Sequence, residues 1–236
     1  MGQRIIDLSL TIDPACNYIQ FPRSTVYGRP EPATTIETVS DINEVNIFVC
    51  KFSMTTQSFT HYDAPAHYIK GGLKNDEVPL ETLIGEGPVI DMMHKAPNEG
   101  VTAEDLEKSG AEIRPGDIAM IRTGWTDRAW GTRQFWEEMI YLSTDACQWL
   151  IQRKIKALAQ DFMTCDPPLN PPPDRRWPAP RWSPNHLDFL GAGIPLIEWL
   201  TNMGSITQPR VTLICLPIKL KGTDGAPCRV IAIEDD

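Results

Sequence analysis

The sequence predicts a mixed α/β fold, in one domain that spans residues 1–236. Three observations support this prediction. Short runs rich in Ile, Val, Phe and Thr recur between turn residues, as in the strands of a sheet. Only two segments combine cap residues with the apolar spacing of a helix. Strands therefore outnumber helices, which indicates a mixed central sheet rather than a regular doubly wound one.

The first half of the chain supplies three expected strands and one expected helix. The strands are at residues 4–10, 44–56 and 87–92, where β-branched and aromatic residues partly alternate with polar ones. The helix is at residues 101–110. Thr102 can cap its first turn, acidic residues follow, and Gly110 is a typical stop.

The second half continues the alternation of strands and helices. A short buried strand at 118–121 should deliver Gly124 and Trp125 to a loop. The second helix runs from Ser143, its expected cap, to about Arg153. The remaining segments are a strand at 155–161, a turn-bounded stretch at 191–200, and two strands at 211–220 and 228–234. Asp161, at the end of the first of these strands, is a turn former or a support for the site.

A proline-rich stretch separates the two parts of the second half. Eight of the 21 prolines lie between Pro167 and Pro184, so the stretch can be neither a helix nor a central strand. Long loops inside compact domains often serve as lids. Trp177 and Trp182 within it favour a lid rather than a disordered linker.

Composition narrows the class of protein. A net charge of −9 argues against a nucleic-acid partner, because phosphate binding needs clustered Lys and Arg. No apolar run approaches the roughly 20 residues of a membrane span, and no export signal opens the chain, so we expect a cytoplasmic protein with no membrane partner. The six cysteines are widely spaced, which is typical of reduced, buried thiols.

The chemically distinctive stretch is QSFTHYDAPAH, residues 57–67, which contains two of the four histidines. A strand here would place Gln57, His61 and Asp63 on one face. A helix would separate His61 from Asp63, and Pro65 would break it. Imidazole, carboxylate and amide groups together form a ligand set for Zn²⁺ or Mn²⁺ and do not resemble a soft thiolate site. The stretch therefore predicts a divalent metal site.

The same stretch resembles the signature His-x-Gly-Thr-His-x-Asp-x-Pro-x-His of the cyclase family of metal-dependent hydrolases, which includes bacterial kynurenine formamidase and isatin hydrolase. Five of the seven fixed positions match: Thr60, His61, Asp63, Pro65 and His67. Gln57 replaces the first His, and Phe59 replaces the Gly. The resemblance extends to IIDLSL, GDIAMIRTGW, ALAQD, HLDFLGAGIPLIEWL and LPIKLKGTDGAPCRVIAIE.

The resemblance implies a swivelling β/β/α domain that assembles as a homodimer or homotetramer. It also implies that His186 and Glu198 complete the metal site, with Glu198 acting in catalysis as well. Asp63 would bridge two ions where two are bound, and His67 would transfer protons. Because Gln57 replaces a ligating His, one position should be weaker or richer in oxygen, which favours Mn²⁺ or a single ion.

Simpler interpretations remain for several of these residues. Gln57 is as well suited to orienting a neighbour as to binding a metal. Glu198 lies in the apolar stretch IPLIEWL, where a carboxylate needs a cation or a partner. Four aromatic residues are assigned to the substrate pocket, although any one of the tryptophans can simply pack in the core: Phe59, Trp125, Trp177 and Trp182.

The function expected from these residues is hydrolysis of a small amide, lactone or ester by metal-activated water, with His67 accepting and returning a proton. The absence of a Gly-x-Ser-x-Gly motif disfavours a serine nucleophile. Two alternatives stay open. The same residues could serve a metal-dependent lyase or dehydratase, or the chain could bind a metal without turnover.

Overall fold

Seven strands of this chain close into a barrel, as the computed structural model shows. The structure describes residues 2–19, 34–168 and 183–235. The strands are β4 (His61–Asp63), β5 (Ile84–Asp91), β7 (Ile118–Arg122), β9 (Ala157–Gln160), β10 (Leu196–Glu198), β11 (Arg210–Pro217) and β12 (Gly225–Asp235). Their order around the barrel is β4, β10, β9, β7, β5, β11 and β12, and β12 pairs back with β4. Strand β1 (Gln3–Asp7) extends the sheet outside the barrel through β12.

The barrel mixes strand directions, as the sequence predicts. Strands β5, β7, β9 and β10 run parallel to their neighbours in that series. The pairings of β4 with β10 and β12, and of β11 with β5 and β12, are antiparallel. The mixed α/β prediction is therefore confirmed, while the swivelling β/β/α description stays a prediction.

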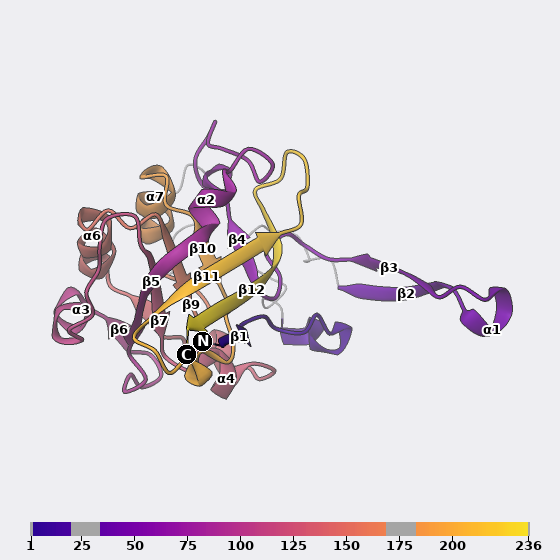
Figure 1. The fold of residues 1–236 in the computed structure, drawn as a ribbon, viewed down its shortest axis with the longest axis horizontal. Helices are drawn as coiled ribbons and strands as arrows, with labels where there is room; N and C mark the ends of the chain where they lie inside the picture. The colour runs from indigo at the N-terminus through magenta and orange to yellow at the C-terminus, as the bar shows by residue number, and fades with distance from the viewer. Residues whose placement is uncertain (1, 20–33, 169–182, 236) are drawn as a thin grey trace.

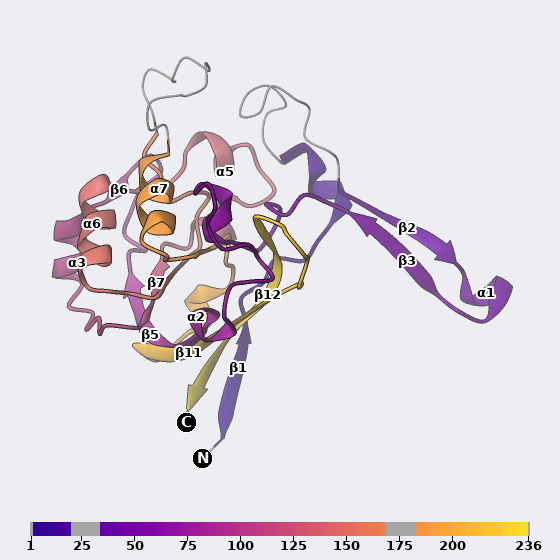
Figure 2. The same cartoon turned by 90° about the horizontal axis from the view of Figure 1, so that it is seen from above.

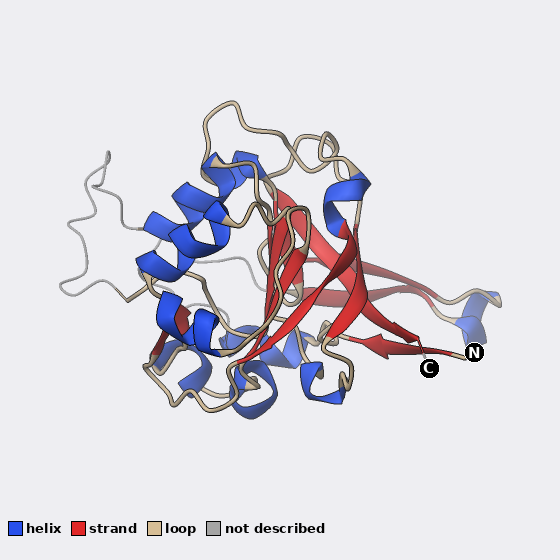
Figure 3. Ribbon diagram, turned by 60° about the vertical axis from the view of Figure 1, so that its left-hand side comes forward, coloured by secondary structure: helices blue, strands red, loops and turns tan. Residues whose placement is uncertain are grey.

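The helices lie outside the strands (Figure 3). Helices α3 (Ala103–Lys108), α6 (Thr144–Gln152) and α7 (Pro184–Gly191) lie side by side along one flank of the barrel (Figures 1 and 2). The shorter elements are α1 (Ile42–Val45), α2 (Leu80–Leu83), α4 (Trp125–Ala129), α5 (Gln134–Glu137), η1 (Pro14–Ile19), η2 (Pro65–His67), η3 (Met203–Ser205), β2 (Thr35–Ser40), β3 (Val49–Ser53), β6 (Gly100–Val101) and β8 (Tyr141–Leu142).

Alternation along the strands divides the apolar residues between two cores. In β7, for example, Ile118 and Met120 belong to the core inside the barrel, whereas Ala119 and Ile121 belong to the core beneath the helices. In β10, Ile197 faces inside and Leu196 faces the helices. Successive strand residues point to opposite faces of a sheet. Glu198, two residues after Leu196, therefore lies on the helix side of the barrel.

Most predicted elements are confirmed, and the exceptions have physical causes. The expected strand at 44–56 begins only at Val49, because Asp41 caps a helical turn that ends at Asn46 in the left-handed conformation. Trp125 opens helix α4 rather than a loop. Ser143 occupies the N-cap of α6, but its hydroxyl donates to Val101 O instead of capping. Thr102 does cap α3.

The proline-rich loop lies mostly among residues 169–182, outside the described residues, so the predicted lid stays a prediction.

Among residues 2–19, 34–168 and 183–235, no helix has the length and apolar character to cross a membrane. All six cysteines are free, and four of them are buried.

Candidate metal centre

The register between β4 and β10 places three ionisable side chains on one face. His61 and Asp63 share a face because they are two residues apart in β4. Glu198 pairs directly with His61 across the two strands, and directly paired residues project to the same side. The strand predicted for His61 and Asp63 is therefore confirmed, and the fold adds Glu198 to it.

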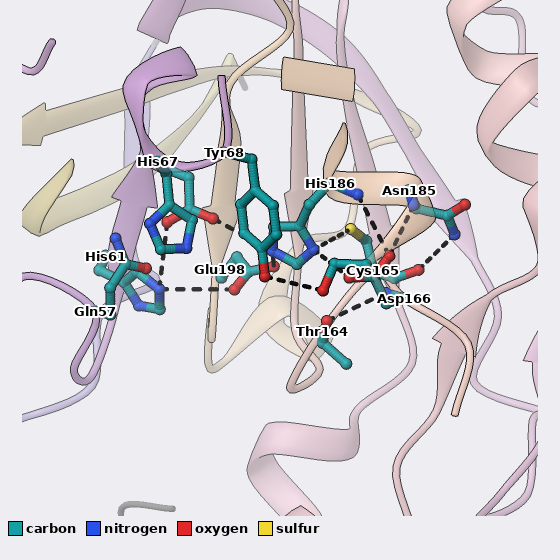
Figure 4. A network of polar contacts seen from close by, with 12 residues as sticks. Gln57, His61, His67, Tyr68, Thr164, Cys165, Asp166, Asn185, His186 and Glu198 are labelled. Atoms are coloured by element: carbon teal, nitrogen blue, oxygen red, sulfur yellow. Dashed lines mark hydrogen bonds and ion pairs between the residues drawn. The ribbon is translucent and has the colours of Figure 1, made fainter. Parts of the chain in front are cut away.

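Helix α7 brings a fourth group, His186, against the same face (Figure 4). The Nε2 atom of His61 lies 3.8 Å from Asp63 Oδ1 and 3.6 Å from Glu198 Oε2. The Nε2 atom of His186 lies 3.4 Å from Asp63 Oδ2 and 3.8 Å from Glu198 Oε1. All four residues are less than 8% exposed. Residues from β4 and from the distant α7 and β10 thus converge at one buried point.

Both imidazoles are held so that Nε2 faces this point. The Nδ1 atom of His61 lies 2.7 Å from the carbonyl oxygen of Phe59, which can only accept, so Nδ1 carries the proton. The Nδ1 atom of His186 lies 2.5 Å from Asp166 Oδ2 and donates to that carboxylate. In the neutral rings each Nε2 then presents a lone pair to the cluster. Fixing one ring nitrogen in this way is the usual support of a metal-ligating histidine.

The carboxylate of Asp63 shows that the cluster fits a cation. Asp63 is completely buried, and neither of its oxygens accepts a hydrogen bond. An ionised carboxylate without donors is costly to bury. Asp63, His186 and Glu198 each offer an atom within 4.8 Å of the others, and the set of carboxylate oxygens and imidazole nitrogens suits Zn²⁺ or Mn²⁺. These residues and His61 could hold one divalent ion.

Electrostatic interactions within the cluster shift the pKa values of its two carboxyl groups in opposite directions. Burial raises the pKa of Asp63, but the charge of His67 and then the interactions with His186 and His61 outweigh burial and hold its pKa below the ordinary value. Burial and then the negative charge of Asp63 raise the pKa of Glu198 well above its ordinary value. Burial lowers the pKa of His61. Glu198 is therefore harder to ionise than Asp63.

His67 lies beside the cluster and has its own acidic partner. Its Nδ1 atom is 2.9 Å from Asp224 Oδ2, and its ring centroid is 6.2 Å from that of His186. Burial lowers the pKa of His67, but the charge of Asp63 and the hydrogen bond to Asp224 raise it further, so the net shift is upward. A histidine held by a carboxylate in this way is suited to proton transfer.

Gln57 is not where a continuous strand would place it. The strand begins at His61, and Gln57 lies in the preceding turn. Its Nε2 atom donates to Asp224 Oδ2 at 3.2 Å, and the Thr56 hydroxyl donates to Asp224 Oδ1 at 2.8 Å. Gln57 therefore does not belong to the strand that carries His61 and Asp63. Its side-chain nitrogen supports the partner of His67, and ligation by its Oε1 atom stays a prediction.

Two aromatic residues expected in the substrate pocket are core residues in this conformation. Phe59 is fully buried and packs edge-on against Trp130, with ring centroids 5.7 Å apart. Trp125 is 4% exposed beneath the helices. Neither side chain presents much surface to a ligand here. Trp177 and Trp182 lie outside the described residues.

An aromatic wall that the sequence did not reveal stands beside His61. The Trp199 ring meets the His61 ring edge-on at 4.9 Å and also contacts Trp130, Phe135 and Trp136. Trp199 directly follows Glu198, so the strand that carries the carboxylate also positions this ring. Trp199 is itself 2% exposed, whereas the Tyr68 ring is partly exposed and also lies against the cluster, with its centroid 4.8 Å from that of His186.

Sequence reasoning missed two supporting acids, Asp166 and Asp224, and one amide, Gln160. Asp166 accepts from the backbone N–H of Asn185 at 2.7 Å and from His186 Nδ1, so it fixes both the start of α7 and the imidazole. Gln160 donates to Glu198 Oε1 at 3.0 Å. The sequence signal that could have indicated Asp166 is its position shortly after the ALAQD strand, where a loop follows the end of a buried strand. Asp161 instead accepts from Thr123 and Gly124 and stabilises the turn before α4, and burial raises its pKa to about 6.

The fold and the cluster together define a mixed α/β barrel protein with a buried site suited to a divalent metal. The chain belongs to the family described as "Putative cyclase", whose model matches residues 6–167. The resemblance seen in the sequence is therefore confirmed.

Relatives and solved structures agree with this assignment. The chain is 25% identical over 232 residues to kynurenine formamidase of Erythrobacter litoralis, covering 98% of this chain and 94% of that protein. It is 27% identical over 192 residues to Cyclase-like protein 1 of Arabidopsis thaliana, covering 79% and 69%. The fold is similar to that of isatin hydrolase A from Labrenzia aggregata, with a TM-score of 0.81, 24% identity, and coverage of 99% and 94%.

Proposed function

We propose that this protein is a metal-dependent hydrolase that cleaves an amide, lactone or ester bond in a small cyclic or aromatic substrate. The observation that carries the proposal is the buried carboxylate of Asp63, which has no hydrogen bond and faces the Nε2 atoms of two histidines. A cation at this point would satisfy Asp63, Glu198 and both imidazoles at once.

The residues around the ion would have different roles in hydrolysis: some would bind the metal, some would orient the imidazoles, and His67 would transfer protons. A bound Zn²⁺ or Mn²⁺ supplies a Lewis acid that lowers the pKa of water and polarises the substrate carbonyl. His61, Asp63, His186 and Glu198 hold it, with Phe59 O and Asp166 fixing the two imidazoles. His67, oriented through Nδ1 by Asp224, takes the proton at Nε2 as water attacks and returns it to the leaving group.

The substrate class rests on the relatives and on an aromatic ring beside the cluster. Kynurenine formamidase and isatin hydrolase are named for aromatic substrates. The Tyr68 ring is partly exposed and its centroid lies 4.8 Å from that of His186, so it would offer such a substrate an apolar face beside the metal ligands. Phe59, where the signature has Gly, alters the packing behind His61, so we expect a substrate that differs from kynurenine precursors.

The test combines metal analysis with a hydrolase screen. The purified protein should contain close to one zinc or manganese ion per chain and should turn over at least one member of a panel of aryl formamides, cyclic imides and lactones. Asp63→Ala should lose the metal and the activity together. His67→Ala should keep the metal but lose at least about 100-fold in kcat, the usual size of a general-base contribution. The opposite pattern would reverse the two roles.

The same samples separate the alternatives. Hydrolysis adds one water molecule to the substrate, whereas a lyase or dehydratase does not, so the product mass distinguishes them. The silent metal-binding alternative is motivated by Gln57, which replaces a His of the family signature and donates a hydrogen bond to Asp224. Full metal occupancy with no turnover across the panel would establish it and contradict the proposed function.

A further inference from the structure

Strand β9 ends in a buried glutamine, Gln160, beside the metal-binding cluster. The strand pairs in parallel with β10, in a register that places Ala159 next to Ile197. Gln160 and Glu198 are the next residues of the two strands, so their side chains project to the same side of the barrel. The Nε2 atom of Gln160 donates to Glu198 Oε1 at 3.0 Å. The strand pairing therefore brings an amide directly against one of the candidate metal ligands.

Within the described residues, the amide of Gln160 differs from the other completely buried amide nearby, that of Asn185. The Nδ2 atom of Asn185 donates to Leu142 O and to Cys165 O, so this side chain ties backbone segments together. The side chain of Gln160 makes no such hydrogen bond to the described backbone, and its donor is used on the Glu198 carboxylate. The role of Gln160 is therefore tied to Glu198.

The carbonyl of the same amide makes Gln160 a costly residue for the fold alone. Its Oε1 atom is buried and accepts no hydrogen bond within the described chain. A buried polar atom without a partner costs free energy. Methionine has nearly the same length as glutamine, and its thioether packs in a core without a hydrogen-bond partner. Packing by itself would therefore favour Met over Gln at this position.

The carboxylate of Glu198 needs a constraint from outside its own side chain in order to face the cluster. Rotation about the last side-chain bond of a glutamate has only broad preferences. In this structure Oε2 lies 3.6 Å from His61 Nε2, and Oε1 lies 3.8 Å from His186 Nε2. The hydrogen bond from Gln160 to Oε1 fixes the rotation that gives both distances.

We propose that Gln160 is a positioning residue, which sets the affinity of the cluster for its metal ion by holding the Glu198 carboxylate in the binding orientation. The inference rests on the metal centre of the proposed function, but it concerns binding of the ion and not the reaction. The two imidazoles of the cluster already have a support of this kind at Nδ1. Gln160 gives the carboxylate an equivalent one, and the loss of such a support usually weakens metal binding 10- to 100-fold.

The variant Gln160→Met tests the proposal on chelator-treated protein to which zinc is added. It keeps the length of the side chain and removes the donor. The Kd for zinc, measured by competition with a chelating dye, should rise about 10- to 100-fold. The Tm of the metal-free variant should stay within about 4 °C of the wild type, because removal of the unpaired carbonyl offsets the lost hydrogen bond.

Gln148→Met is the matched control. The Nε2 atom of Gln148 also donates to a carboxylate, Asp188 Oδ2 at 2.8 Å, but on the exposed side of α6. Its Kd for zinc should equal that of the wild type. The visible spectrum of bound Co²⁺, which depends on ligand geometry, should change in Gln160→Met and not in Gln148→Met. A lower Tm with an unchanged Kd and spectrum would mean that Gln160 only stabilises the fold, and would overturn the proposal.

Crystals of the wild-type protein grown with zinc give a test that does not depend on the folding of a variant. An ion bound by Glu198, with Gln160 Nε2 still donating to the same carboxylate, supports the proposal. A Glu198 carboxylate that binds the ion after turning away from Gln160 overturns it. Wild-type protein that binds no zinc would overturn the metal centre together with this inference, whereas equal Kd values in wild type and Gln160→Met would overturn only the role of Gln160.

Discussion

Asp224 orients the His67 ring through a hydrogen bond. It accepts a hydrogen bond from His67 Nδ1, and donors from Thr56 and Gln57 hold its carboxylate in place. Burial raises the pKa of Asp224, but the hydrogen bonds from His67 and Thr56 hold it below the ordinary value. The carboxylate is therefore ionised at neutral pH and stabilises the protonated form of His67.

Replacing this acid should change the pH dependence of activity while leaving the metal bound. In Asp224→Asn the negative charge is lost, so the pKa of His67 falls and the limb of the pH–rate profile that reports it moves to lower pH. Turnover should drop about 10- to 100-fold because the ring is less well oriented. Metal content measured on the same sample should equal that of the wild type. An unchanged profile with lost metal would mean that Asp224 supports the ion instead.

Phe59 combines an unfavourable backbone conformation with a buried side chain. Its φ angle is 58°, in the left-handed region where glycine is favoured, and the family signature has Gly here. Its ring, however, is fully buried against Trp130. The left-handed backbone at Phe59 costs about 1–2 kcal/mol, and the packing of the large aromatic side chain offsets this cost.

Two substitutions separate strain from packing. Both Phe59→Ala and Phe59→Gly should lower the free energy of unfolding, by about 3 kcal/mol or more for the alanine variant. Glycine usually costs about 0.5–1 kcal/mol relative to alanine inside an element, but here it should be at least as stable as alanine because it relieves the positive φ. Urea unfolding measures both. A glycine variant clearly less stable than the alanine variant would show that the strain is negligible.

At the scale of the element, α3 depends on an acid that is sensitive to pH. Asp105 accepts from the backbone N–H and hydroxyl of Thr102, completing a capping box, and pairs with Lys95 at 2.7 Å. Burial opposes ionisation, but the hydrogen bonds from Lys95 and Thr102 lower the pKa of Asp105 to about 2. A folded-state pKa below the unfolded value stabilises the fold above about pH 4, and this contribution is lost as the pH falls toward 2.

The expected size of this effect can be measured by difference. Between pH 6 and pH 3 the wild type should lose about 1 kcal/mol more unfolding free energy than Asp105→Asn, whose cap no longer titrates. Urea unfolding at the two pH values gives both numbers. Glu104→Gln, which removes an exposed carboxylate from the same helix, should behave like the wild type. Equal losses in wild type and Asp105→Asn would contradict the role of the cap.

The elements also show what sequence reasoning can and cannot reach. Thr102 and Gly110 bound the predicted helix correctly because capping is local chemistry. Strand β4 was located by alternation, but Gln57 was placed on its face because alternation cannot show where a strand begins. Helix α7 was missed, although Pro184 at its first position is a recognised start signal.

At the scale of the whole molecule, the site depends on topology that local patterns do not encode. Local reasoning brought His61 next to Asp63, but only the family resemblance pointed to His186 and Glu198. The positions of His186 and Glu198 next to Asp63 depend on the pairing of β10 with β4 and on Asp166, which anchors α7 beside β9. Such long-range register is set by the closed barrel as a unit, so a single sequence predicts the ligand types better than their meeting point.

A cation held by β4, β10 and α7 should therefore stabilise the entire fold. Any ligand that binds only the folded state adds about 2.7 kcal/mol at a concentration 100 times its Kd. For a chain of this length that corresponds to a rise in Tm of about 5–10 °C. We expect added zinc or manganese to raise the Tm of chelator-treated protein by this amount and to leave the Tm of Asp63→Ala unchanged. Magnesium is the control ion, because it prefers sites made of oxygen alone and should have little effect. An equal rise with all three ions, or a rise in Asp63→Ala, would place the binding elsewhere on the molecule.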